Sequence, residues 1–205
     1  MPVALQCSRM KPMTVILLGR SGSGKGTQVE KLSEVLTKST GRPVFHMESG
    51  KRFRDFIAGP TYAASFSRAI NETGGLQPEF LSIWAWTGEL VEHLTAENHL
   101  LIDGSPRRVA EARTLESALQ FFKRDDVAVI HIKVTRAWAV ERLTARGRAD
   151  DVEIADVNAR MDWFEREVEP VVKHFSGHPT ISFAEIDGEQ SIDAVHAAIL
   201  TALGL

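Results

Sequence analysis

The sequence predicts an α/β protein in which a five-stranded parallel sheet is flanked by helices. Five short apolar runs rich in Val, Ile and Leu alternate along the 205-residue chain with longer stretches whose apolar residues recur every three or four positions. The runs are nearly continuous, which is typical of parallel strands that are covered on both faces. Strands and helices in regular alternation favour one α/β unit over two independent domains.

Each expected element follows from a local pattern. The first apolar run leads directly into a glycine-rich segment, and the helical pattern after it ends near Gly41-Arg-Pro, a sequence that stops helices. The expected strands are residues 14–18, 43–47, 99–103, 127–134 and 180–186. The expected helices are residues 27–39, 78–95, 151–175 and 191–203.

The composition indicates one soluble globular unit. Hydrophobic residues make up 43% of the chain and charged residues 25%, and the net charge of −3 gives no reason to expect a nucleic acid polymer or a membrane as a partner. The one cysteine, Cys7, excludes an intrachain disulfide and a multi-cysteine zinc site. No stretch has the pattern of a signal peptide or a membrane span. We therefore expect a cytoplasmic protein with a leader over residues 1–12 and a single domain over residues 13–205.

The segment Gly19-Arg-Ser-Gly-Ser-Gly-Lys-Gly-Thr-Gln28 has the context of a phosphate-binding loop, because it joins an expected strand to an expected helix. Glycines let successive backbone N–H groups turn toward one anion, and the first turn of the helix adds its own unpaired N–H groups. Lys25 would then reach the β- and γ-phosphates of a nucleotide. Gly26 stands where the general pattern has a magnesium-binding hydroxyl, so we expect the metal to be held differently.

The Gly-Lys-Gly-Thr-Gln form of this loop resembles that of adenylate kinases and UMP/CMP kinases, and other motifs of that family follow in the same order over residues 13–203. They are Glu48-Ser-Gly-Lys-Arg-Phe-Arg54, Asp103-Gly-Ser-Pro-Arg107, Glu141-Arg-Leu-Thr-Ala-Arg146, and Gly147-Arg-Ala-Asp-Asp151 with Arg160. Ser105 stands where the family has Phe. Together the motifs indicate the family, although not one base.

The resemblance implies a fold of the P-loop NTPase type with a monophosphate-binding insertion and a short lid. The core would comprise residues 13–47, 78–146 and 158–205, the insertion residues 48–77 and the lid residues 147–157. The lid segment contains no cysteine, so the zinc site of some relatives is not expected. The implied ligands are ATP and a nucleoside monophosphate, the implied cofactor is Mg²⁺, and the implied state is a monomer.

The residues assigned by the resemblance are mainly glycines and arginines, which suits a reaction that depends on positioning and charge neutralisation. The implied ATP-binding residues are Gly22, Ser23, Gly24, Lys25, Gly26, Thr27, Arg142 (beside the adenine) and Gln190. The implied catalytic residues are Lys25, Arg107, Arg146, Arg148 and Arg160. The implied monophosphate-binding residues are Ser49, Gly50, Arg54, Gln77, Gly104, Arg107 and Glu111. Asp103 would orient Mg²⁺ through water.

Glu111 leaves the acceptor base open. It stands where AMP-binding members have a glutamine that pairs with adenine, and an ionised carboxylate accepts hydrogen bonds but donates none. It would suit the amino group of adenine or cytosine, and the N1–H and amino group of guanine better still. The alternative is that Glu111 faces solvent on a helix beside Arg108 or Arg113.

We therefore expect a nucleoside monophosphate kinase with AMP as its first acceptor (ATP + AMP = 2 ADP). The alternatives are a UMP/CMP or other monophosphate kinase, a kinase for a sugar or shikimate-like hydroxyl, and a nucleotide-binding scaffold without turnover. Two arginines expected on the acceptor side favour a phosphate acceptor over a neutral hydroxyl. The presence of Lys25, Asp103 and the arginines favours an active enzyme.

Overall fold

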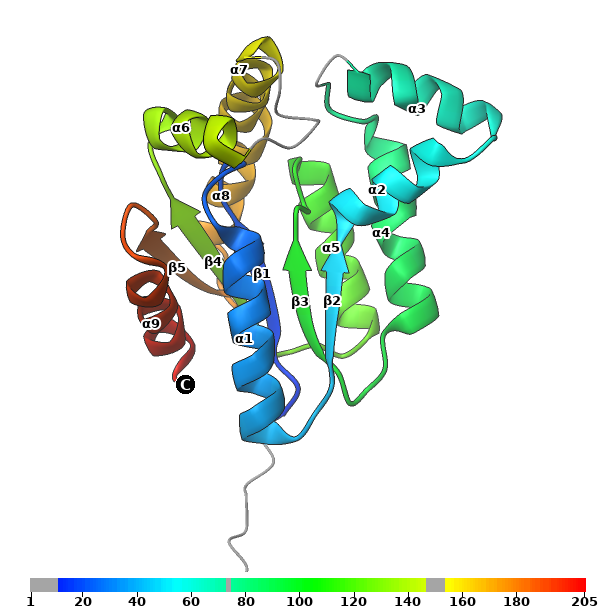
Figure 1. The fold of residues 1–205 in the computed structure, drawn as a ribbon. Helices are drawn as coiled ribbons and strands as arrows, with labels where there is room; N and C mark the ends of the chain where they lie inside the picture. Colours follow the sequence, from blue (N-terminus) through cyan, green and yellow to red (C-terminus); the bar gives the residue numbers. More distant parts are fainter. Residues whose placement is uncertain (1–10, 73–74, 147–153) are drawn as a thin grey trace, which may run out of the picture.

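The computed structural model describes residues 11–72, 75–146 and 154–205. Its centre is a five-stranded parallel sheet in the order β2–β3–β1–β4–β5 (Figure 1). The strands are β1 (Thr14–Leu18), β2 (Val44–Glu48), β3 (His99–Asp103), β4 (Val127–Lys133) and β5 (Ser182–Asp187). The predicted fold class is thereby confirmed.

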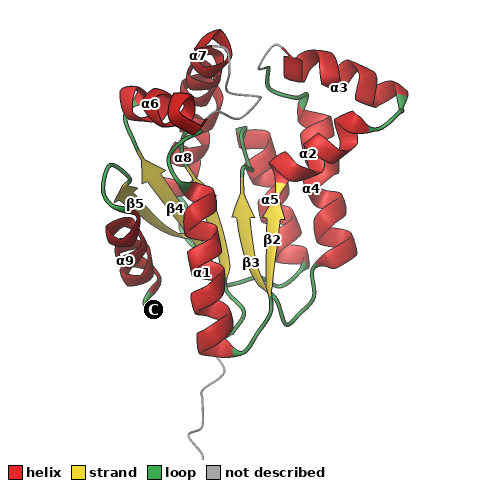
Figure 2. Cartoon of the chain, viewed as in Figure 1, coloured by secondary structure: helices red, strands yellow, loops and turns green. Residues whose placement is uncertain are grey.

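Helices pack against both faces of this sheet, which forms a single layer of strands between them in Figure 2. One face carries α1 (Lys25–Thr40) and α9 (Ile192–Leu203); the other carries α4 (Glu79–His93), α5 (Val109–Phe121) and α8 (Glu169–Ser176). The central strand β1 is buried at every position, with Val15 and Leu17 in one hydrophobic cluster and Ile16 and Leu18 in the other. Burial on both faces explains why its sequence is a continuous apolar run.

The remaining helices stand near the carboxyl ends of the strands (Figure 1). They are α2 (Ser49–Ala58), α3 (Tyr62–Glu72), α6 (Arg136–Arg146) and α7 (Ile154–Trp163). A π-helical segment, η2 (Phe164–Val168), joins α7 to α8 without a break. A small apolar cluster holds α6 to α7, with Leu143 and Met161 fully buried in it. These helices surround the sheet edge at which the strands end.

The strand order places a topological switch beside β1. From β1 the chain goes to β2 at one edge of the sheet and returns to β3 beside β1. After β3 it passes β1 and continues to β4 on the other side of β1. Parallel α/β sheets bind ligands at such a point, outside the carboxyl ends of the strands. The fold therefore indicates the loops after β1 and β3 as the place to look for a site.

The observed strands lie within two residues of the predicted ones at both ends, and α1, α4 and α9 match three predicted helices. The fourth, predicted over residues 151–175, is interrupted by the π-helical segment η2. Residues 1–10 of the expected leader and 147–153 of the expected lid lie outside the described residues. Among the described residues, no helix is both long and apolar enough to cross a membrane.

Candidate active site

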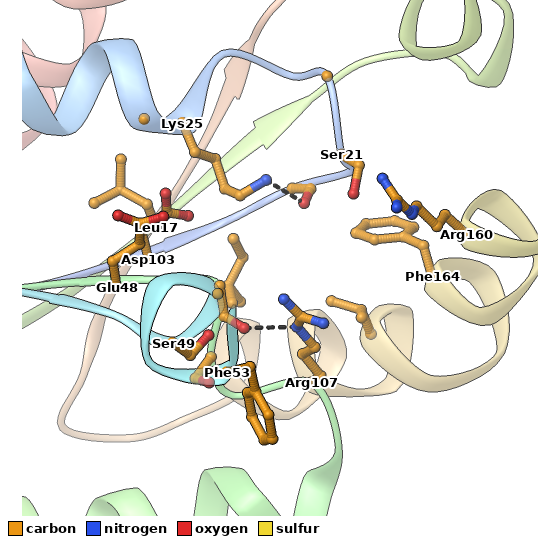
Figure 3. Close-up of a pocket in the computed structure, with 18 of the residues that line it drawn as sticks. Leu17, Ser21, Lys25, Glu48, Ser49, Phe53, Asp103, Arg107, Arg160 and Phe164 are labelled. Atoms are coloured by element: carbon orange, nitrogen blue, oxygen red, sulfur yellow. Dashed lines mark hydrogen bonds between the residues drawn. The ribbon is translucent and has the colours of Figure 1, made fainter. Parts of the chain in front are cut away.

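A cavity of about 1040 Å³ lies at the carboxyl ends of β1, β2 and β3. Its walls come from the glycine-rich loop after β1, from α2 and the residues that lead into α4, from the turn after β3, and from α6, α7 and η2. Figure 3 shows Lys25, Ser49, Arg107 and Arg160 around this space. The cavity is at the upper end of the range for ligand pockets.

The glycine-rich loop lines one side of the cavity and leads into α1. Gly22 has a φ of 85°, and a Cβ there would lie 2.9 Å from the Ala139 carbonyl oxygen of α6, so both the conformation and the close approach require glycine. Gly24 is the N-cap of α1 and also has a positive φ, of 91°. The Lys25 ammonium group donates to the Gly19 and Arg20 carbonyl oxygens at 2.8 and 2.9 Å, which holds it along the loop.

The turn after β3 places Asp103 and Arg107 on the opposite side. Gly104 has a φ of 81°, and a Cβ there would lie 2.8 Å from Ser49 Oγ. Arg107 Nε donates to the Gly104 carbonyl oxygen at 2.6 Å, so the guanidinium is held within the cavity wall. Burial lowers the pKa of Arg107, whereas the nearby carboxylates of Glu111 and Asp103 raise it. The arrangement presents a cation, held by its own turn, to the enclosed space.

Glu111 is fully buried, at 0% exposure, and does not face solvent as one reading of the sequence had it. Its Oε2 accepts the backbone N–H of Arg107 at 3.0 Å, and its Oε1 lies 3.7 Å from Arg108 Nη1. Burial raises the pKa of Glu111, while the Arg107 N–H and the Arg107 and Arg108 charges oppose that rise. Glu111 is also absent from the described lining of the cavity. In this structure it supports the turn that carries Arg107.

The other predicted acceptor-side residues line the cavity. Ser49 is buried, and its hydroxyl has no hydrogen-bond partner among the described residues. Arg54 on α2 is half exposed and donates to Glu48 Oε1 at 2.9 Å. Gln77 bonds to Ser67 of α3 through both ends of its amide, at 2.7 and 2.9 Å, so it holds α3 to the segment before α4. Gly50 lies beside Arg54.

The predicted catalytic and ATP-binding residues beyond the loop lie around two cavities. Arg160 on α7 lines the main cavity, and Arg142 on α6 lines both this cavity and a smaller one of about 40 Å³. The smaller cavity also includes Ser23, Thr27 and Gln190. The side chain of Arg146 and all of Arg148 lie outside the described residues, so the structure does not place these two predicted catalytic arginines.

Two tryptophans beside the site were missed by sequence reasoning. The Arg142 guanidinium lies 4.9 Å from the centre of the Trp138 ring, and that of Arg107 lies 5.3 Å from the centre of the Trp163 ring. Trp138 lines the small cavity and Trp163 the large one. Trp138 and Arg142 are four residues apart on α6, a spacing that could have suggested their contact.

The acidic residues at this edge fit a magnesium ion that is held mainly by water and substrate. Glu48 and Asp103 are register partners at the ends of β2 and β3. A Cβ built on Gly26 would lie 4.0 Å from Asp103 Oδ2, so this carboxylate faces the start of α1. Among the described residues no group of three potential ligands forms. Oxygen donors few in number suit Mg²⁺, which keeps several waters and binds nucleotide phosphates.

Comparison with known proteins indicates one family. The family model described as "Adenylate kinase" matches residues 17–179. The chain is 34% identical to the adenylate kinase of Mycobacterium sp. (strain MCS), over 94% of this chain and 99% of that protein. It is 31% identical to the adenylate kinase of Stenotrophomonas maltophilia (strain K279a), over 93% and 99% of the two chains. It is 35% identical to the adenylate kinase of Nocardia farcinica (strain IFM 10152), over 94% and 99%.

Proposed function

This chain belongs to the adenylate kinase family, and from that membership we propose that it transfers the γ-phosphoryl group of Mg-ATP to a nucleoside monophosphate, with AMP as the first acceptor. The observation that best supports the proposal is the main cavity itself. It joins Lys25 of the glycine-rich loop to arginines from three other segments, Arg54, Arg107 and Arg160. A site with this many cations around one space suits two polyanionic substrates.

In the proposed reaction an oxygen of the acceptor phosphate bonds to the γ-phosphorus of ATP, while the bond from that phosphorus to the β,γ-bridging oxygen breaks. ADP leaves with the bridging oxygen, and the acceptor becomes a diphosphate. No protein nucleophile is needed, so the work of the protein is to position the two substrates and to neutralise charge.

The cationic residues divide by their places around the cavity. Lys25 and the backbone N–H groups of residues 22–27 would hold the ATP phosphates, and Arg54 and Arg107 would hold the acceptor phosphate. Arg160, with Arg146 and Arg148, would surround the transferred group. Arginine suits these roles because its planar fork binds two phosphate oxygens at once. Mg²⁺ would offset charge between the β- and γ-phosphates, and Asp103 would orient it through water.

We also propose the domain division that the sequence predicts, with one insertion and one lid around the core. The insertion over residues 48–77, which includes α2 and α3, would cover the acceptor, and the lid over residues 147–157 would cover ATP. Closure of both would exclude water, which could otherwise accept the phosphoryl group. We further propose a monomer that works in the cytoplasm, as the family resemblance implies; light scattering on the purified protein tests the monomer.

The test is to supply the purified protein with Mg-ATP and, separately, AMP, CMP, UMP, GMP and dAMP, and to measure ADP formation. We expect the highest kcat/KM with AMP. Absence of turnover with every acceptor, despite ATP binding measured by calorimetry, would contradict the proposal and favour a nucleotide-binding scaffold or a different acceptor.

A second candidate, a kinase that prefers another base, is favoured by one observation. Glu111 Oε1 is buried and has no hydrogen-bond partner among the described residues. A base that brought an amino or ring N–H group to this oxygen would satisfy it, and guanine offers both groups. A higher kcat/KM with GMP or CMP than with AMP, reversed by Glu111→Gln, would support this candidate.

A further inference from the structure

Arg20 belongs to the glycine-rich loop but is absent from the described lining of the cavity, although its neighbours Gly19 and Ser21 are part of it. Its side chain is 14% exposed and runs to the other side of the loop. Nη2 lies 2.9 Å from Glu165 Oε1 and 3.5 Å from Glu169 Oε1, and Nη1 donates to the Val134 carbonyl oxygen at 3.4 Å. The guanidinium also lies 4.6 Å from the centre of the Phe164 ring. These contacts are unlike those of a phosphate-binding arginine.

The partners of Arg20 lie in the segment that follows Arg160. Phe164 and Glu165 begin the π-helical segment η2, and Glu169 begins α8. Phe164 is four residues after Arg160, so the two side chains lie on one face of the continuous helix, and both line the cavity. Figure 3 shows them along one wall, near Ser21 of the loop. Single turns of π-helix within α-helices are frequent at functional sites.

Glu165 connects this contact to α6. Its Oε2 lies 3.6 Å from Arg136 Nη1, which also pairs with Asp162 at 2.6 Å. Arg136 Nη2 donates to Asn158 Oδ1 at 3.1 Å. Ion pairs and hydrogen bonds therefore join the glycine-rich loop, the start of α6 and the α7–η2 segment.

We propose that Arg20 is a positioning residue, which holds η2 against the glycine-rich loop so that Arg160 on the preceding turn faces the phosphates. The inference rests on the proposed function, because it assigns Arg160 to the transferred group. Arg20 itself contacts no substrate. Since Glu165 and Glu169 are 40% and 46% exposed, removal of Arg20 leaves both carboxylates in contact with water rather than buried and unpaired. Its loss should therefore affect turnover more than stability.

The first test is Arg20→Met, which keeps a long side chain and removes the charge. We expect kcat to fall about 10- to 100-fold, the range associated with a misplacement of roughly 1 Å, while KM for the monophosphate changes less than about twofold. Amide hydrogen exchange in residues 154–168 should become faster without any ligand. Arg42→Met is the matched control, because Arg42 is similarly buried, at 16% exposure, and pairs with Glu97 at the opposite end of the sheet; it should change neither readout.

A double-mutant cycle separates a shared contact from two independent effects. Arg20→Met and Glu165→Gln should each lower kcat, and the double variant should lose less than the product of the two single losses, because the contact between Arg20 and Glu165 is lost in both. Arg20→Lys should recover part of kcat, since an ammonium keeps the charge without the planar fork. Multiplying effects in the double variant, or unchanged kcat and exchange in Arg20→Met, would overturn the proposal. If the wild-type protein shows no kinase activity, the proposed function fails, whereas the exchange measurement still decides whether Arg20 holds η2.

Discussion

At the scale of single residues, Arg107 shows how the local chain commits a side chain to a site. The Gly104 carbonyl oxygen and the ring of Trp163 hold its guanidinium from two sides, and Glu111 holds its backbone N–H. Such a side chain loses little further rotamer freedom when an anion binds. The same contacts also mean that Arg107 cannot be replaced by lysine without loss of the forked geometry.

We expect Arg107→Ala to lower kcat by roughly 10³-fold or more, because arginines that stabilise charge in phosphoryl transfer contribute on that scale. Steady-state kinetics with saturating ATP and AMP measures the change. Arg113→Ala is the control, since Arg113 is exposed on α5 and is not part of either described cavity lining. A loss below tenfold would remove Arg107 from the catalytic group.

Trp138 allows a prediction about the donor side. Its contact with Arg142 at the small cavity should keep that guanidinium flat for the ATP base, so Trp138→Leu should raise KM for ATP about 3- to 10-fold, as a partly exposed cation–π contact allows. Binding of inorganic tripolyphosphate, which has no base, should not change. Trp84→Leu is the control, because the Arg52 guanidinium likewise lies over the Trp84 ring and neither residue is part of either described cavity lining. Equal weakening of tripolyphosphate and ATP would contradict a role at the base.

At the scale of elements, the three inner strands β1, β3 and β4 were predictable because they are buried on both faces and are therefore mostly apolar. The continuous apolar run of β1 and the glycines after it predicted both the first strand and the position of the site. The π-helical segment η2 was not predictable from the sequence. Its residues keep nearly α-helical spacing, and the extra residue in its turn depends on tertiary contacts such as that of Phe164 with Arg20.

The burial of Glu111 could not be predicted from the sequence either. A carboxylate on a charged helix predicts a solvent-exposed side chain. The Glu111 carboxylate instead accepts a hydrogen bond from the backbone N–H of Arg107, in the turn four residues earlier. Arg20 is a similar case: the loop motif directs attention to phosphate, and only the fold shows that Glu165, 145 residues away, is its partner. The pairing of Arg20 with Glu165 leaves no local pattern in the sequence, whereas the contact of Glu111 with Arg107 spans only four residues.

His99 at the start of β3 supports a prediction at this scale. It is fully buried; Met13 of the chain before β1 donates its N–H to Nδ1 at 3.1 Å, and Nε2 bonds to Thr40 of α1 at 3.0 Å. Because Nδ1 accepts, the ring must be neutral, with its proton on Nε2. Burial lowers the pKa of His99, and the charges of Arg42 and Arg124 lower it further.

A lowered His pKa means that the unfolded chain binds this proton more readily than the folded one. Stability from His99 is therefore present above the unfolded value of 6.5 and is lost as pH falls below it toward the folded pKa. Urea unfolding should show the wild type losing up to about 1.4 kcal/mol per pH unit more than His99→Gln in that window. His131 and His196, whose pKa values are also lowered, occur in both proteins and cancel in the difference. If the unfolding free energies of the two proteins changed with pH in the same way, protonation of His99 would not differ between the folded and unfolded states.

At the scale of the whole molecule, the site is assembled from segments that lie far apart in the sequence. The glycine-rich loop, α2, the turn after β3, and α7 with η2 enter the cavity from different parts of the chain. The cavity wall carries several cations, among them Lys25, Arg54, Arg107 and Arg160, and the charge of Arg160 lowers the pKa of Arg107. A polyanion bound among them would relieve the repulsion between these charges and join the segments, so ligand binding should stabilise the fold as a whole.

This argument predicts the response of thermal unfolding to ATP. At about 100 times its Kd, a ligand specific to the folded state adds about 2.7 kcal/mol, which for a chain of this size raises Tm by about 5–10 °C. Calorimetry without acceptor should show this rise in the wild type and in Arg113→Ala. Lys25→Met should lose most of this rise, while its ligand-free Tm stays close to that of the wild type. The ammonium group of Lys25 is only partly buried, and the Gly19 and Arg20 carbonyl oxygens, which are among its partners, can bond to water instead. A full ATP shift in Lys25→Met would mean that the nucleotide stabilises the protein from a place other than the glycine-rich loop.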